Sequence, residues 1–144
     1  MNTTAAGIKL VITNILFPGG RTIDEAADDV AFINVSRPTL GNVQVGLNGH
    51  QVDWDVANVL QIDVAVIPNS GSDKALKLIS TGGRIQGGSI PTPIYSTISI
   101  VEADGTSNTY VNMKMTDGDI ANSTSTDGRL ATRTYTFQGV NRVL

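Results

Sequence analysis

The sequence predicts a mainly β fold with one α-helix packed against the sheet. Residues 60–66 alternate apolar and polar side chains, and the apolar face at this strand period of two holds Leu60, Ile62, Val64 and Val66. The following segment changes period: at about 100° per residue, an arc of roughly 160° holds Ala75, Leu76, Leu78 and Ile79. The other apolar runs are short and bounded by Gly, Pro, Asn and Asp, which is typical of strands joined by turns.

Length and composition narrow the class of protein. The 144 residues fit one domain, spanning 1–144, that buries roughly two-thirds of its unfolded surface. Cysteine is absent, which excludes disulfides, thiolate metal sites and cysteine nucleophiles. The net charge of −3 gives no electrostatic support to a nucleic-acid-binding surface. No apolar run suits a bilayer crossing, and the first residues lack the pattern of a signal peptide. We therefore expect cytoplasmic synthesis and no membrane insertion.

The amino-terminal part predicts strands and one acidic loop. Residues 8–12 form the first strand, and the turn-forming residues 17–20 lead to its hairpin partner at 21–23. The acidic run 24–29 is too charged for a core, so we expect a surface loop or a short helical turn. Strand character resumes over residues 30–35.

The clearest hairpin signal lies in the next segment. Residues 42–45 and 52–54 flank Asn48 and Gly49, and this dipeptide tolerates the positive φ angles of a tight turn. We expect the two runs to pair antiparallel.

The predicted helix has recognisable ends. Ser70 and Asp73 have the spacing of a capping box, in which the serine oxygen accepts an N–H of the first turn and the acid accepts the serine N–H. Gly82 or Gly83 ends the helix.

The remaining segments predict a connection, a second hairpin, a loop and a closing strand. Residues 84–93 contain too many breakers for regular structure, and residues 94–101 and 108–115 form the hairpin. The polar loop 117–127 precedes a closing β segment over residues 131–140. One face of that segment holds Tyr135 and Phe137.

Few residues suggest catalysis or metal binding. His50 is the one histidine and lies beside a turn, where it fits a polar turn residue better than a catalytic base. Asp53 and Asp55 share a strand face, which could serve a hydrolase or a metal, but the sequence shows no electrophile stabiliser. Asp117 and Asp119 lack the remaining ligands of a calcium loop. We therefore predict no catalytic, cofactor-binding or metal-binding residue and no enzyme activity.

A carbohydrate-binding or adhesin-like β-sandwich is an alternative. Its ligand platform would use Trp54, Tyr95 or Tyr110, although an aromatic content of 5% is lean for that role. Trp54 fits equally an anchor for a protein partner or a buried core position.

The order of elements resembles that of the tail tube proteins of bacteriophages with contractile tails. The resemblance is carried by the hairpin around residues 48–52, the strand 60–66, the break at 68–70 and the leucine-bearing helix that follows. It covers most of the chain as an order of elements, and its residue-level part lies within positions 30–80. Residues 84–93 and 117–127 have no counterpart.

This resemblance implies a tail-tube-like β-sandwich or barrel with one flanking α-helix. It also implies hexameric rings that stack into a tube, through which DNA passes without specific binding. The implied partners are further copies of the chain and the tail sheath, baseplate and tail terminator proteins, within the tail of the virion. We expect residues 2–6 and 46–51 to supply part of the assembly contacts. Secretion-system tube proteins share the expected ring architecture and form the nearest alternative.

Overall fold

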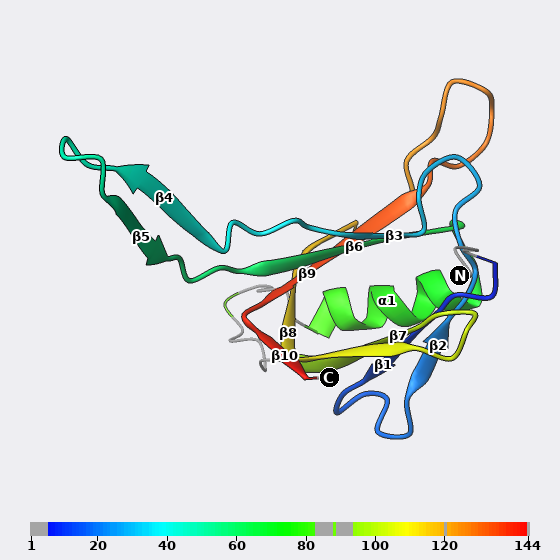
Figure 1. Cartoon of the computed structure of the whole chain (residues 1–144). Coiled ribbons are helices and arrows are strands. Elements are labelled where there is room, and N and C mark those ends of the chain that lie inside the picture. Colours follow the sequence, from blue (N-terminus) through cyan, green and yellow to red (C-terminus); the bar gives the residue numbers. More distant parts are fainter. Residues whose placement is uncertain (1–5, 83–87, 89–93, 120, 144) are drawn as a thin grey trace.

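An eight-stranded antiparallel sheet curves around the helix α1 (Gly71–Gly82) in the computed structural model, which describes residues 6–82, 88, 94–119 and 121–143 (Figure 1). The order across the sheet is β2-β1-β7-β8-β9-β6-β3, and β10 also pairs with β8. The bounds are β1 Lys9–Thr13, β2 Arg21–Ile23, β3 Ile33–Val35, β6 Leu60–Val66, β7 Tyr95–Val101, β8 Ser107–Gly118, β9 Arg133–Gly139 and β10 Asn141–Val143. A separate two-stranded sheet holds β4 (Gly41–Val45) and β5 (Gln51–Asp55).

The curvature brings the two ends of the large sheet to opposite sides of α1. Strands β6 and β9 lie on one side of the helix, and β1 and β7 lie on the other (Figure 1). The buried side chains of both sides form one core with the helix, composed of Leu10, Ile12, Ile23, Ile62, Val64, Val66, Ala75, Leu76, Ile79, Ile94, Ile98, Ile100, Tyr110, Met113, Tyr135 and Phe137. The expected mainly β fold with one flanking helix is confirmed, and its two layers are opposite ends of one sheet.

The predicted strands agree with the structure in most places. Both hairpins expected in the large sheet are present, as β1 with β2 and β7 with β8. The strand expected over residues 30–35 is wrong for its first part, because only Ile33–Val35 pairs, with β6. Strand β10 was not predicted. The expected connection at 84–93 falls, apart from residue 88, outside the described residues.

The apolar face of α1 differs from the predicted one at a single position. Ala75, Leu76 and Ile79 are buried as expected, whereas Leu78 is 58% exposed and belongs to the outer side of the helix. The sequence pattern placed it at the limit of a wide arc, and the curved sheet covers only part of that arc. Within the described residues, no helix combines the length and apolar character that a bilayer crossing requires.

The amino-terminal cap of α1 is a modified capping box. Ser70 Oγ accepts the N–H of Asp73 at 3.2 Å, as predicted. The carboxylate of Asp73, however, accepts the N–H of Asn69 at 2.9 Å, one residue earlier than predicted. The shift follows from a second role of this carboxylate, which is buried in the core.

Asp73 joins α1 to β9 through a buried polar cluster. Arg133 Nη1 donates to Asp73 Oδ2 at 3.0 Å, and the Tyr135 hydroxyl donates to Asp73 Oδ1 at 2.8 Å. Asp73 and Arg133 are 1% and 2% exposed. Burying two charges is costly unless they pair and hydrogen-bond, so this cluster fixes the helix at one position on the sheet. Removing either partner leaves an uncompensated charge in the core.

Candidate assembly surface

Strands β4 and β5 form a two-stranded arm that extends away from the sheet and helix (Figure 1). We call residues 41–55 the β4–β5 arm. Its register pairs Gly41 with Asp55 and Val45 with Gln51. The turn is the one predicted: Gly49 has a φ angle of +80°, and its N–H donates to the carbonyl of Gly46 at 2.9 Å. The predicted hairpin is therefore confirmed, but it is not part of the main sheet.

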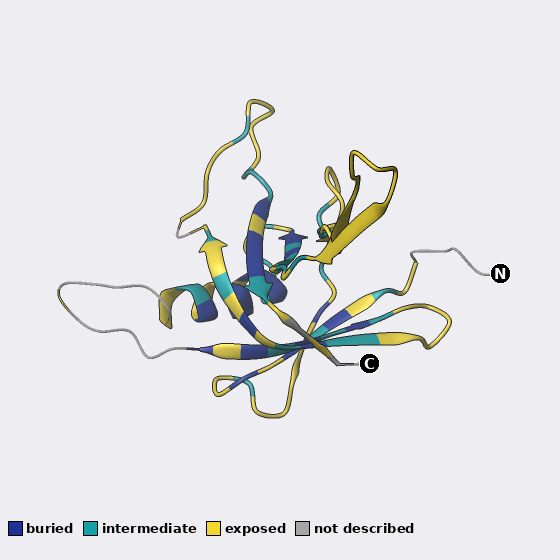
Figure 2. Ribbon diagram, turned by 60° about the vertical axis from the view of Figure 1, so that its left-hand side comes forward, coloured by how far each residue is buried: buried dark blue, intermediate teal, exposed yellow. Residues whose placement is uncertain are grey.

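The arm exposes apolar side chains that have no cover in the described chain. Figure 2 shows the whole two-stranded ribbon as exposed, in contrast to the strands around the helix. The exposed fractions are highest at Leu47 (109%) and Val45 (71%). The other large apolar residues of the arm that are exposed are Val43, Val52 and Trp54. Exposed apolar side chains gathered on one projecting element indicate a surface that another molecule covers.

The pairing register divides the arm into two faces. Residues directly opposite each other share a face, and neighbours along a strand alternate between faces. One face, which we call the acidic face, holds Gly41, Val43, Val45, Gln51, Asp53 and Asp55. The other, the tryptophan face, holds Asn42, Gln44, Val52 and Trp54.

Hydrogen bonds fix the base of the arm where it joins the body. The N–H of Val56 donates to the carbonyl of Leu40 at 3.0 Å, which continues the ribbon by one pair. The side-chain amide of Asn58 donates to the carbonyls of Val56, at 3.0 Å, and Thr39. The arm is thus held at its base, and along its length the described residues of the body form no hydrogen bond with it.

The candidate catalytic residues lie on this arm and form no enclosed site. His50, Asp53 and Asp55 are exposed, and the two aspartates share the acidic face as their spacing predicted. Among the described residues, no group of three or more His, Asp or Glu side chains is arranged to bind a metal. Paired carboxylates on a projecting ribbon lack the concave, water-excluding surroundings that acid–base chemistry uses.

The aromatic platform of the carbohydrate-binding alternative is not assembled. Tyr110 is 8% exposed and belongs to the core, whereas Tyr95 is exposed on β7. Trp54 is on the separate two-stranded sheet and is 44% exposed. The buried-core interpretation of Trp54 is therefore wrong, and its exposure agrees with an anchor for a protein partner.

The loop between β8 and β9 contacts the acidic loop that precedes β3. Arg129 makes two hydrogen bonds to Asp28, at 2.7 and 3.0 Å, and Thr132 donates to Asp29 at 2.5 Å. The hydrogen bond from Arg129 lowers the pKa of the Asp28 carboxyl. Asp119 accepts the N–H of Thr134 at 3.4 Å, so it stabilises this loop. These contacts give structural roles to loops whose roles the sequence left open.

Sequence reasoning missed two features of the molecule. The first is the burial of Arg133. Arg133 alternates with Tyr135 and Phe137 along β9, so the strand period alone predicts that the arginine shares their buried face. The exposure of Val43 and Val45 had no such signal, because an alternating ribbon has the same pattern whether or not a second layer covers it.

Comparison with solved structures finds this fold in a chain of the anti-feeding prophage (AFP) baseplate, in a six-fold symmetrised structure. The TM-score is 0.50 at 9% sequence identity, and the match covers 96% of this chain and 91% of that chain. A chain of the AFP tube terminating cap matches with a TM-score of 0.46 at 14% identity, over 99% and 91% of the two chains. At this identity the baseplate match is evidence for the fold alone. None of the curated proteins matches in sequence.

The family comparison defines the class. A family model described as tail fiber protein gp32 matches residues 1–141. The chain is a structural protein of phage tails. It belongs to the tail fiber protein gp32 family. The expectation from the sequence that the chain is a phage tail protein, and so a component of the virion, is confirmed.

Proposed function

We propose that the chain is the subunit of a phage tail tube, in which hexameric rings stack into a conduit for DNA. In this role it is a structural part and catalyses no reaction. Its partners are further copies of itself and the tail sheath, baseplate and tail terminator proteins. It is made in the host cytoplasm and functions in the virion.

The observation that carries this proposal is the β4–β5 arm. An isolated two-stranded ribbon is marginally stable in water, and this one exposes large apolar residues on both faces. Its stability and solubility therefore call for a surface on another molecule. Every copy carries the arm on one side and its complement elsewhere. Contacts of this heterologous kind build closed rings or open stacks.

The edges of the large sheet also support a ring. Its end strands β2 and β3, each three residues long, each leave one edge without a partner strand among the described residues. Unpaired sheet edges invite pairing, and closure around a ring removes them.

The face of the large sheet turned away from α1 suits the wall of a channel. On β6 and β9 this face is polar and hydrogen-bonded: Thr136 donates to Asp63 at 2.7 Å, and Gln138 Nε2 donates to Gln61 Oε1 at 3.4 Å. On β6 and β9 these groups and the Asp63 carboxylate carry no positive charge that would attract phosphate, and the lysines of this face, Lys9 and Lys114, lie on β1 and β8. Together with the net charge of −3, this lets DNA slide past.

A tail fiber subunit is the second candidate, because the matching family is described by that name. The two roles differ in one visible property: a tube subunit forms rings with an open channel, whereas a fiber subunit needs no channel.

Negative-stain microscopy of the purified chain at increasing concentration tests the choice. The tube proposal expects rings with a stained central channel and stacks of these rings. Solid rods without a channel would favour the fiber role, and protein that stays monomeric at high concentration and alongside tail partners would contradict both.

A further inference from the structure

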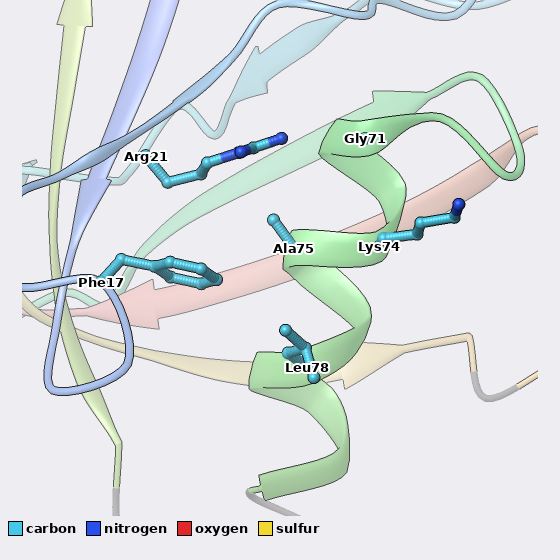
Figure 3. Close-up of a pocket in the computed structure, with 6 residues that line it drawn as sticks. All are labelled: Phe17, Arg21, Gly71, Lys74, Ala75 and Leu78. Atoms are coloured by element: carbon cyan, nitrogen blue, oxygen red, sulfur yellow. The ribbon is translucent and has the colours of Figure 1, made fainter.

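A shallow groove lies between the loop after β1 and the outer side of α1. It is lined by Phe17, Arg21, Gly71, Lys74, Ala75 and Leu78, and its volume is about 240 Å³ (Figure 3). Figure 3 shows the Phe17 ring directed toward the helix beside Ala75 and Leu78. A cavity of about 150 Å³ holds a benzene molecule, so this apolar floor has room for an aliphatic or aromatic side chain.

Positive charge borders the groove near the start of the helix. Arg21 extends across it toward Gly71, while the ammonium group of Lys74 points outward from its rim (Figure 3). Gly71 permits the approach of Arg21, since a Cβ there would lie 3.0 Å from Arg21 Nη2 and 3.1 Å from Glu25 Oε1. Glu25 offsets part of this charge. In the described part of the chain, neither Arg21 nor Lys74 forms a side-chain hydrogen bond or ion pair.

The acidic face of the β4–β5 arm has the complementary chemistry. It places Val43 and Val45 on one strand beside Asp53 and Asp55 on the other. The two aspartates are about 7 Å apart along the strand. Arg21 reaches the helix at Gly71, and the backbone of Lys74 lies about 4.5 Å further along the helix axis, so both flexible cations border the same end of the groove.

Three other exposed acids are less suited to this groove because their own chain already binds them. Asp28 pairs with Arg129, Asp29 accepts from Thr132, and Asp127 accepts from Ser125. Asp53 and Asp55, in contrast, have no side-chain partner among the described residues.

We propose that this groove receives the acidic face of the β4–β5 arm of a second copy of the chain. Val43 and Val45 of the incoming arm contact Phe17 and Leu78, and Asp53 and Asp55 lie against Arg21 and Lys74. The contact explains why Leu78 is exposed on an otherwise amphipathic helix. The inference rests on the proposed tube assembly and names the surface that the arm contacts there.

Engineered cysteines test the contact directly, because the 144-residue sequence contains none. Val43→Cys and Leu78→Cys are prepared as separate proteins, mixed, assembled and oxidised. A disulfide between different chains is then read by gel and by mass spectrometry of the linked peptides. The matched control replaces Val43→Cys with Val52→Cys, which lies on the tryptophan face of the same arm.

We expect the Val43→Cys and Leu78→Cys mixture to form at least about tenfold more linked dimer than the control, since neighbouring strand positions point to opposite faces. Normal tubes without this link, or with equal linking through Val52→Cys, would overturn the groove assignment and leave the tube function standing. Failure of the unmodified chain to form any ring or tube would overturn the function as well.

Charge exchange gives an independent readout. Arg21→Glu with Lys74→Glu, or Asp53→Lys with Asp55→Lys, is expected to raise the concentration needed for assembly by about tenfold, because attraction becomes repulsion. Combining all four changes should restore assembly to within about threefold of the parent. Lys9→Glu with Lys114→Glu makes the same net charge change as the Arg21 and Lys74 pair, at exposed positions outside the groove, and should leave assembly unchanged. An absence of rescue, with each variant folded by circular dichroism, would contradict the proposed pairing.

Discussion

Strand β6 and the β4–β5 arm are built from similar residues but lie in opposite surroundings. Ile62, Val64 and Val66 of β6 are fully buried between the sheet and α1. Val43 and Val45 of the arm alternate in the same way and are 62% and 71% exposed. An alternating pattern thus specifies a strand and its two faces, while the surface that covers the apolar face belongs to the tertiary or quaternary structure. In the body that surface is α1, and for the arm we propose a second copy.

The largest expected effect on stability is at the buried charge of the body. Asp73→Ala leaves Arg133 buried without its partner, so we expect the free energy of unfolding to fall by about 3–5 kcal/mol. Asp53→Ala removes an exposed aspartate from the arm and should change the free energy of unfolding by less than about 0.5 kcal/mol. Urea denaturation of dispersed protein measures both, and equal midpoints would contradict the role of the buried cluster.

The buried and exposed sides of α1 offer a second comparison between covered and uncovered residues. Leu76→Ala or Ile79→Ala opens a cavity in the core and should cost about 2–5 kcal/mol. Lys77→Ala should stay within about 0.5 kcal/mol, and Leu78→Ala should stay below about 1 kcal/mol because its side chain faces outward. Chemical denaturation of the four variants checks this order. A large loss at Leu78 would mean that the dispersed protein already buries it.

High pH should lower the stability of the folded protein through Tyr135. Burial, and then the hydrogen bond to Asp73, raise the pKa of this hydroxyl well above its ordinary value. The folded state therefore keeps a proton that the unfolded state releases above about pH 10, so rising pH favours unfolding. We expect Tyr135→Phe to flatten the loss of stability between about pH 9 and pH 11. Parallel slopes for the variant and the parent would contradict this assignment.

The smallest expected effect is on nucleic acid. With a net charge of −3 and a polar channel face, the dispersed subunit should show no measurable affinity for duplex DNA at physiological salt. A gel-shift titration measures this. A salt-sensitive complex with DNA at low micromolar protein would count against the conduit role.

Local patterns predicted most of the fold. The periods of β6 and α1, the Asn48 and Gly49 turn, and the shared face of Tyr135 and Phe137 all recur in the structure. Each depends on neighbours a few residues away, which is the range that sequence patterns report.

Long-range features were less accessible to sequence reasoning. The pairing of Asp73 with Arg133 joins residues that are 60 positions apart. The separation of the arm from the main sheet depends on which strands pair, and the groove at Phe17 and Leu78 combines a loop with a distant helix. Local periodicity is silent on such contacts. The candidate site was therefore predicted only as a hairpin, and its apolar exposure came from the structure.

Microscopy of the parent beside an arm-replaced variant tests the central claim most directly. The variant substitutes a short glycine and serine linker for residues 41–55, outside the buried core. We predict that it keeps the circular dichroism of the folded body, and an unfolding midpoint near that of the dispersed parent, but forms no tubes at concentrations where the parent does. Tubes of equal length from the folded variant would contradict the assignment of the β4–β5 arm as the assembly element.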